Sequence, residues 1–279
     1  MRNQKRNITF DFSDYHVVIT GGASGIGQST AIEFAKAGAK VAVIDRDPAT
    51  ETEEKAAALG LTIQSYQADV SSGEQMEAVG QEILKAFDNR VDVLFCNAGV
   101  GQDVATRGAC EKAPDEEWLR GYNINTVGVI RTTKAFIPAM KENLFGKIII
   151  TSSIAAYLPD PIKPVYCVTK LATIEYALCL AKEMGEFNVN VNVINPGLVY
   201  TAIYSKGTAM ALKKLQPGMF DDCETGEEVV QKMGAANSAL RRAQQPEDCA
   251  YTVQYLASEE SKELTGQIFN IDSGIVMNV

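Results

Sequence analysis

The sequence has few of the side chains that usually carry metal or thiol chemistry. Its 279 residues include a single histidine, His16, and six scattered cysteines, none of which form a Cys-x-x-Cys pair. So few imidazoles and paired thiols indicate no metal site. Scattered cysteines are typical of small buried apolar residues in a reducing compartment, so we expect a cytoplasmic protein.

Positive charge and long apolar runs are also scarce. Lys and Arg number 26 against 35 Asp and Glu, which gives a net charge of −9. Nucleic acids attract clustered positive charge, so this balance argues against a nucleic-acid partner. Uninterrupted apolar runs, such as residues 148–150, fall far below the roughly 20 residues that span a bilayer. Residues 1–7 are polar and basic, unlike a secretion signal. We therefore expect no membrane partner.

Short β-branched runs alternate with longer amphipathic stretches along most of the chain. The runs predict strands at residues 16–20, 40–45, 62–66, 92–95, 147–152, 189–194 and 267–271. The stretches predict helices at residues 25–37, 49–59, 71–87, 114–141, 165–184 and 246–257. Such alternation means parallel strands joined by right-handed helical crossovers. The sequence thus predicts an α/β fold, with a doubly wound, mostly parallel, Rossmann-like sheet of about seven strands and helices on both faces.

One domain accounts for this pattern. A chain that is 46% hydrophobic can bury a substantial core. We expect an N-terminal arm at residues 1–14 and a single domain at 15–279. Residues 202–241 interrupt the alternation and carry irregularly spaced apolar side chains. An insertion after the carboxyl end of a strand lies near the ligand crevice, so we expect a lid over a substrate. The alternative is an apolar patch that packs against a neighbouring subunit.

Tyr166 and Lys170 lie four residues apart on a predicted helix, so the phenol and the ammonium project from the same face. A neighbouring ammonium favours the phenolate and lowers the tyrosine pKa from its usual value of about 10. Ser153, upstream of Tyr166, supplies a hydroxyl that can hold a substrate oxygen. The alternative is a chance spacing, although no other tyrosine has a lysine four residues on. Cys167 is no nucleophile in this interpretation, because no histidine is available to activate it.

A glycine-rich segment joins the first predicted strand to the first predicted helix. Residues 20–27 read Thr-Gly-Gly-Ala-Ser-Gly-Ile-Gly. Glycines let the backbone approach a pyrophosphate, and the start of a helix offers free N–H donors. The strand–loop–helix context indicates a nucleotide site. Its expected contacts are Gly21, Ser24, Gly25, Ile26 and Gly27.

Asp45 ends the second predicted strand. A carboxylate there accepts hydrogen bonds from both adenosine-ribose hydroxyls and repels a 2′-phosphate. Arg46 offers the opposite interpretation, because a guanidinium can bind that phosphate. The residue before Gly25 is Ser24 rather than a basic residue, so only one feature favours NADP. We expect NAD.

Together these residues resemble the short-chain dehydrogenase/reductase family in its compact single-domain form. Thr20-Gly-x-x-x-Gly25-x-Gly27 is similar to its cofactor loop, and Tyr166-x-x-x-Lys170 with Ser153 is similar to its catalytic group. Other family-like segments follow in the family's order between about Tyr15 and Ser273. By resemblance they are cofactor contacts at Asp69 and Val70, at Asn97, Ala98 and Gly99, and at Pro196, Gly197, Val199 and Thr201, and a catalytic asparagine at Asn125.

The resemblance also implies roles. Tyr166 would protonate a carbonyl oxygen while hydride arrives from the nicotinamide, and Lys170 would lower its pKa and bind the nicotinamide ribose. Ser153 would stabilise charge on the substrate oxygen. Asn125 would hold a water that links Lys170 to solvent. A homo-oligomer, tetramer or dimer, is implied as well.

The sequence therefore predicts an NAD(H)-dependent oxidoreductase that interconverts a secondary alcohol and a ketone. The apolar residues of the expected lid favour a bulky apolar small molecule, such as a steroid, terpenoid or cyclic alcohol. The alternative is NADPH-dependent reduction of a 3-oxoacyl thioester on acyl carrier protein, with Arg131 and Lys182 as basic contacts. A non-catalytic nucleotide-binding regulator is a third interpretation, against which the complete set of Ser153, Tyr166 and Lys170 argues.

Overall fold

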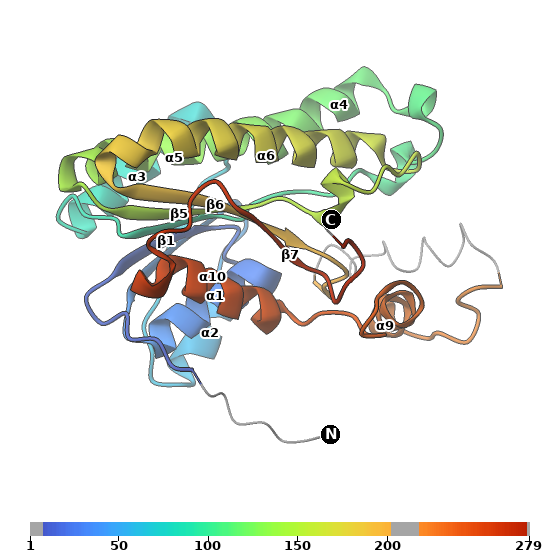
Figure 1. Ribbon diagram of the computed structural model, residues 1–279, viewed down its shortest axis with the longest axis horizontal. Helices are drawn as coiled ribbons and strands as arrows, with labels where there is room; N and C mark the ends of the chain where they lie inside the picture. The colour runs from blue at the N-terminus through green and yellow to red at the C-terminus, as the bar shows by residue number, and fades with distance from the viewer. Residues whose placement is uncertain (1–7, 202–217, 278–279) are drawn as a thin grey trace.

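The computed structural model describes residues 8–201 and 218–277 and contains one parallel sheet between two layers of helices (Figure 1). Its strand order is β3-β2-β1-β4-β5-β6-β7. The direction of winding reverses between β1 and β4, which is where open α/β sheets bind ligands. The strands are β1 (His16–Thr20), β2 (Lys40–Asp45), β3 (Gln64–Gln67), β4 (Val93–Cys96), β5 (Gly146–Thr151), β6 (Val189–Pro196) and β7 (Ile268–Ile271).

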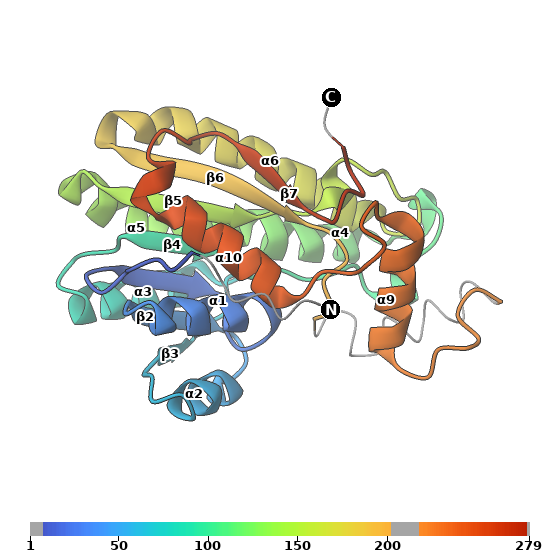
Figure 2. The same ribbon diagram turned by 60° about the horizontal axis from the view of Figure 1, so that its bottom comes forward.

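The helices form the two outer layers. α3, α5 and α6 cover one face of the sheet, and α1, α2 and α10 cover the other (Figures 1 and 2). The predicted doubly wound fold is confirmed. The helices are α1 (Gly25–Lys36), α2 (Thr50–Ala57), α3 (Gly73–Ala86), α4 (Asp115–Tyr122), α5 (Gly128–Asn143), α6 (Pro164–Met184), α9 (Gly226–Asn237) and α10 (Pro246–Ala257).

The central strands are mostly apolar because both faces of the sheet are covered. Every residue of β1, β4 and β5 is buried. Successive side chains point to opposite faces, so Val18 and Leu94 join the core under α3, α5 and α6. Val17 and Phe95 join the core under α1 and α10. Each such side chain contributes about 1.5–3 kcal/mol on burial, which holds the strand ends in fixed positions.

Some predicted boundaries were wrong. The predicted strand 62–66 is β3 at Gln64–Gln67, an edge strand whose polar sequence gives no clear period. The predicted helix 114–141 is divided by a π-helix at Asn123–Val127. Helix α9 was not predicted, although Thr225 and Glu228 form a reciprocal capping box that marks its beginning.

The expected arm and lid are partly outside the described residues. Residues 1–7 of the arm and 202–217 of the lid fall there. Within the described part of the expected arm, Phe12 is buried against Phe34, and its N–H donates to Ala37 O (2.7 Å). In the described part of the lid, Phe220 packs with Val229 of α9.

Among the residues that the structure describes, one helix is long and apolar enough to cross a membrane by length and composition alone. It comprises α6 and the following turn, Pro164–Phe187, and half of its most apolar window is buried inside the molecule. Ile174, Ala177 and Leu180 of this helix belong to the core beneath it. Its apolar composition is therefore explained by packing on the sheet.

Candidate active site

A cavity of about 850 Å³ opens at the carboxyl ends of the strands, where the strand order reverses. Such a volume is typical of sites for cofactors and small molecules. It is lined by most of the residues that the sequence singled out. These are Gly21, Ser24, Gly25, Ile26, Asp45, Arg46, Asp69, Val70, Asn97, Ala98, Gly99, Ser153, Tyr166, Lys170, Pro196, Gly197, Val199 and Thr201.

The glycine-rich loop has the shape that close approach of a phosphate requires. Gly21 has φ +72°, and a Cβ there would lie 2.9 Å from Ala98 Cα. Gly27 is absent from the cavity wall because it packs beneath the loop, where a Cβ would lie 2.1 Å from Gly21 O. Ser24 precedes α1 without a side-chain capping bond, and the first turn carries no acidic residue. The helix therefore presents its N–H donors and positive dipole end to the cavity, which fits a pyrophosphate.

Asp45 is held at the end of β2 by two backbone donors. Its Oδ2 accepts from Ala23 N (3.0 Å) and its Oδ1 accepts from Asp47 N (3.1 Å). The carboxylate thus faces the glycine-rich loop. The Arg46 side chain is 59% exposed, and its Nε lies 3.6 Å from Asp47 Oδ2.

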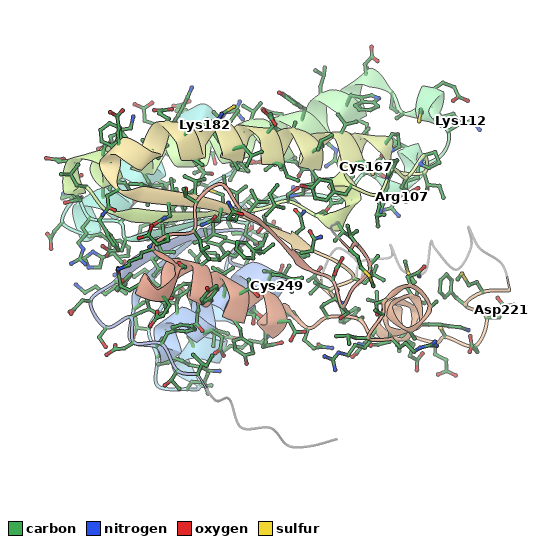
Figure 3. The ribbon with its side chains drawn as sticks, in the orientation of Figure 1. Arg107, Lys112, Cys167, Lys182, Asp221 and Cys249 are labelled. Carbon is green, nitrogen blue, oxygen red and sulfur yellow. The ribbon has the colours of Figure 1, made fainter. Side chains whose placement is uncertain are left out.

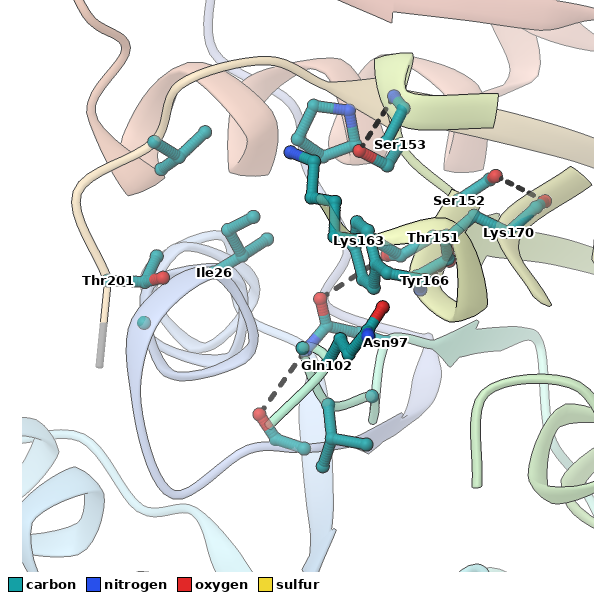
Figure 4. Close-up of a pocket in the computed structure, with 18 of the residues that line it drawn as sticks. Ile26, Asn97, Gln102, Thr151, Ser152, Ser153, Lys163, Tyr166, Lys170 and Thr201 are labelled. Atoms are coloured by element: carbon teal, nitrogen blue, oxygen red, sulfur yellow. Dashed lines mark hydrogen bonds between the residues drawn. The ribbon is translucent and has the colours of Figure 1, made fainter. Parts of the chain in front are cut away.

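Asn97 joins the ends of three strands around the cavity (Figure 4). Its Nδ2 donates to Thr20 O and to Gly21 O, both at 3.3 Å. Its Oδ1 accepts from Thr151 Oγ1 (3.3 Å). Asn97 therefore fixes the glycine-rich loop relative to β4 and β5. Asp69 is engaged locally, with Oδ1 accepting from Ser71 N (2.7 Å).

Lys170 and Tyr166 are brought together on the wall of the cavity. The Lys170 Nζ lies 5.8 Å from the centre of the Tyr166 ring and donates to Thr151 O (2.9 Å). The lysine is buried, and desolvation lowers its pKa to about 8. A cation that is costly to bury is thus held beside a phenol, as is common at functional sites.

The two adjacent serines differ in what their hydroxyls bind. Ser152 Oγ donates to Lys170 O (2.7 Å) and ties β5 to α6. Ser153 Oγ instead accepts from Ala155 N (3.1 Å). Because an accepting hydroxyl keeps its own hydrogen, Ser153 can still donate to an oxygen in the cavity.

Asn125 lies in the π-helix, behind the wall of the cavity rather than on it. Its Oδ1 accepts from Val100 N (2.8 Å), and its Nδ2 donates to Val100 O (3.0 Å) and Thr169 Oγ1 (3.1 Å). A Cβ on Gly99 would lie 3.1 Å from Asn125 Oδ1 and 3.3 Å from Lys170 Nζ. Asn125 and Lys170 therefore meet at the same glycine, and the asparagine anchors the loop that follows β4. Single π-turns are common at functional sites.

Cys167 lies beside Tyr166 on α6, at the end of the molecule where Figure 3 also labels Arg107. Its Sγ donates weakly to Leu158 O (3.8 Å). Burial raises the pKa of the Cys167 thiol. A raised pKa disfavours the thiolate, so the geometry favours Tyr166 over Cys167 as the reactive group.

Several residues on the cavity wall were not found from the sequence. Lys163 could have been, because it precedes Tyr166 by three residues and shares its helix face. The others come from separate segments and carry no joint pattern. They are Gln102, Asp103, Arg107, Leu158, Asp160, Ile162 and Ile275. Met219, Phe220, Met233 and Asn237 also line the cavity and belong to residues 202–241, where a lid was expected.

Comparisons with known proteins define the class. The family model described as enoyl-(acyl carrier protein) reductase matches residues 21–276. Together with the parallel sheet and the site above, this match shows that the chain belongs to the short-chain dehydrogenase/reductase family. It is an oxidoreductase of that type.

Its relatives act on different substrates. The 3-oxoacyl-[acyl-carrier-protein] reductase FabG of Thermotoga maritima is 28% identical over 262 residues, covering 93% of this chain and 97% of the relative. The structure of L-sorbose reductase from Gluconobacter frateurii, complexed with NADPH and L-sorbose, has a TM-score of 0.85 at 28% identity and covers 98% of this chain and 100% of its own. The structure of NAD+-bound xylitol dehydrogenase has a TM-score of 0.82 at 25% identity, and the match covers 94% of this chain and 99% of the xylitol dehydrogenase chain.

Proposed function

We propose that this protein is an NAD(H)-dependent oxidoreductase that interconverts a secondary alcohol and a ketone. The observation that carries the proposal is that Ser153, Tyr166 and Lys170 line the same cavity as the glycine-rich loop. A proton donor, a hydroxyl that holds an oxygen and a nucleotide cradle are the parts that carbonyl reduction needs. When bound, the nicotinamide cofactor supplies or accepts the hydride.

The chain's own residues handle the proton and the substrate oxygen. Tyr166 gives its phenolic proton to the carbonyl oxygen, or takes it from the alcohol in the reverse direction. Ser153 donates its O–H to the same oxygen and stabilises the negative charge that develops there. The Lys170 ammonium favours the phenolate of Tyr166. Asn125, anchored next to Lys170, supports a proton path from the lysine to solvent.

The test of this catalytic role is Tyr166→Phe. The variant is expected to lower kcat by about 10²-fold or more, because the acid is removed while the ring remains. Cofactor binding, followed by the fluorescence of the reduced nicotinamide, is expected to persist. Activity within tenfold of the parent would remove Tyr166 from its role. Cys167→Ser, on the next residue, is the matched control and is expected to retain its rate.

The preference for NAD rests on Asp45. Its carboxylate faces the glycine-rich loop through the Ala23 N–H, where it would repel a 2′-phosphate. Arg46 is directed to solvent and to Asp47. The ratio of kcat/KM for NADH and NADPH tests the assignment. Asp45→Ser is expected to shift that ratio towards NADPH by at least tenfold. A parent enzyme that prefers NADPH would overturn the assignment.

A bulky apolar substrate is supported by the wall of the cavity away from the glycine-rich loop. Apolar side chains there come from four separate segments of the chain: Leu158 and Ile162, Met219 and Phe220, Met233 of α9, and Ile275 after β7. Steroids, terpenoids and cyclic alcohols present the matching surface. A screen of alcohols and ketones at 340 nm with both cofactors tests this substrate class.

A 3-oxoacyl thioester is the second candidate substrate, and the similarity to FabG over 93% of the chain favours it. Arg131 and Lys182 are the two basic residues that could contact an acyl carrier protein. The Arg131 guanidinium already binds within the chain, since its Nη1 donates to Asn123 Oδ1 (2.8 Å). Lys182 is exposed, but Figure 3 shows it at the opposite end of α6 from Cys167. Reduction of acetoacetyl thioester with NADPH, without turnover of simple alcohols with NAD, would favour this candidate.

We also propose a cytoplasmic homo-oligomer, a dimer or tetramer. Leu119 and Tyr122 on α4, with Val168 and Leu171 on α6, are exposed apolar residues on two helices that pack together. An exposed apolar patch of this kind is typical of an interface, and a second copy of the chain is the expected occupant. Leu171→Glu should lower the mass measured by light scattering. A monomeric parent would contradict the proposal.

A further inference from the structure

Lys163 places a second positive charge beside the phenol of Tyr166. We propose that Lys163, together with Lys170, sets the acidity of Tyr166, and that the Asp160 carboxylate moderates this effect. Lys163 is thus a positioning residue that acts through the tyrosine. The inference deepens the proposed function and rests on the role given there to Tyr166.

The spacing of the three residues explains the arrangement. Lys170 follows Tyr166 by four residues within α6, and Lys163, the residue that caps the beginning of α6, precedes Tyr166 by three. The Lys163 Nζ lies 6.0 Å from the centre of the Tyr166 ring, and the Lys170 Nζ lies 5.8 Å from it. Figure 4 shows Lys163 beside Tyr166. The two cations are therefore nearly equidistant from the ring.

The backbone beneath Lys163 is fixed by contacts with the loop after β4. Lys163 is the capping residue of α6, and Pro164 occupies the first turn. Gln102 is buried, and its Oε1 accepts from Val165 N (3.2 Å) while its Nε2 donates to Thr106 O (3.0 Å). The start of α6 is thus held to that loop. The backbone position of Lys163 therefore follows from the fold.

The two cations differ in their surroundings. Lys170 is buried and its pKa is lowered to about 8, so its charge begins to be lost just above neutral pH. The Lys163 side chain is 34% exposed, and its Nζ lies 3.7 Å from Asp160 Oδ2. This separation is that of a loose ion pair. Asp160 should therefore weaken the field of Lys163 at the phenol without cancelling it.

Other charged groups of the cavity also contribute to the field. At the same end as Lys163, Arg107 donates through Nε to Gln102 O (3.2 Å), and Asp103 lies on the same loop. The remaining charged groups on the wall lie at the nucleotide end and are Asp45, Arg46, Asp47 and Asp69. Among the described residues, the lysines on the wall are Lys163, which caps the beginning of α6, and Lys170, which lies within it. These two are therefore the variants that isolate the effect.

The size of the effect follows from Coulomb's law. With the 6.0 Å between Lys163 Nζ and the centre of the Tyr166 ring taken as the separation of the two charges, an effective dielectric constant between about 20 and 80 gives a pKa change of about 0.5–2 for Tyr166 when the Lys163 charge is removed. The removal is expected to raise the phenol pKa. Removal of the Asp160 charge is expected to lower it.

The test is an ultraviolet titration of phenol ionisation in the cofactor-free protein. Subtraction of the same titration in each matching Tyr166→Phe background isolates Tyr166 from the other tyrosines. Lys163→Met is expected to raise the midpoint by about 0.5–2 pH units, and Asp160→Asn to lower it. Lys163→Arg keeps the charge and is expected to restore the parent midpoint. Lys182→Met, at the far end of α6, is the control and is expected to leave it unchanged.

Equal midpoints in the parent and in Lys163→Met would overturn the inference, as would an equal rise in Lys163→Met and Lys163→Arg. The second outcome would assign Lys163 a structural role only. The acid limb of kcat/KM for alcohol oxidation is expected to move with the titration midpoint. The titration requires no substrate, so its result does not depend on the proposed function. Failure of the proposed function would show separately, as full activity in Tyr166→Phe.

Discussion

Replacement of Lys170 by methionine is expected to stabilise the protein while it removes activity. The lysine is buried and its charge is solvated only in part, by the bond to Thr151 O. Methionine has a similar length and no charge, so it fills the same space without a desolvation cost. Active-site groups often cost stability in this way.

The magnitude follows from the lysine pKa and its dependence on pH. A fall from 10.5 to about 8 corresponds to about 3 kcal/mol of destabilisation by the buried charge. Below pH 8 the lysine is protonated in both folded and unfolded states, so the full cost is present. Between about pH 8 and 10.5 the folded protein loses the proton first, and the cost disappears. Loss of the bond to Thr151 O subtracts about 1–2 kcal/mol from the gain. The net gain at pH 7 is then about 1–2 kcal/mol.

The assay is urea unfolding of the cofactor-free protein at fixed concentration, at pH 7 and at pH 10. Lys170→Met is expected to be more stable than the parent at pH 7 and to lose that advantage at pH 10. Lys182→Met, on the exposed side of the same helix, is expected to change stability by less than about 0.5 kcal/mol at both. A variant that is less stable than the parent at pH 7, or whose advantage grows with pH, would refute the reasoning.

Three further predictions concern individual contacts of the site. Gly27→Ala is expected to abolish cofactor binding in a fluorescence titration, because its Cβ would lie 2.1 Å from Gly21 O; unchanged affinity would contradict the loop geometry. Ser152→Ala is expected to lower the free energy of unfolding by about 1–2 kcal/mol through loss of its bond to Lys170 O, with kcat retained. Ser153→Ala is expected to reduce kcat by about 10²-fold and to leave the free energy of unfolding nearly unchanged. Similar kinetics for the Ser152 and Ser153 variants would contradict the different roles given to the two serines.

Much of the site could be read from local sequence because its parts are short segments with fixed geometry. The glycine-rich loop is set by a strand, a turn and a helix that follow one another directly. The spacing of Tyr166 and Lys170 is converted into contact by the period of the helix alone. Asp45 follows from the end of a buried strand. For such features, the spacing of residues along the chain determines the distance between their side chains.

Other features depended on packing between distant segments. Ser152 and Ser153 are equivalent by composition, and only the contact of β5 with α6 distinguishes them. Phe12 lies in the expected N-terminal arm, and its burial depends on Phe34 of α1, which lies beside it. Helix α9 was not predicted, although Val229, Val230 and Met233 recur at helical spacing and a capping box marks its beginning.

The sequence by itself determined the layered fold, the glycine-rich loop and the spacing of Tyr166 and Lys170, because periodic apolar burial and helix geometry operate over a few residues. Only the tertiary structure decided what surrounds that pair. Gln102, Leu158 and Ile275 meet in one cavity although they are far apart along the chain, and Lys163 is held there by the loop after β4. No local period encodes such meetings, since they arise from the crossovers that bring the strand ends to one edge of the sheet.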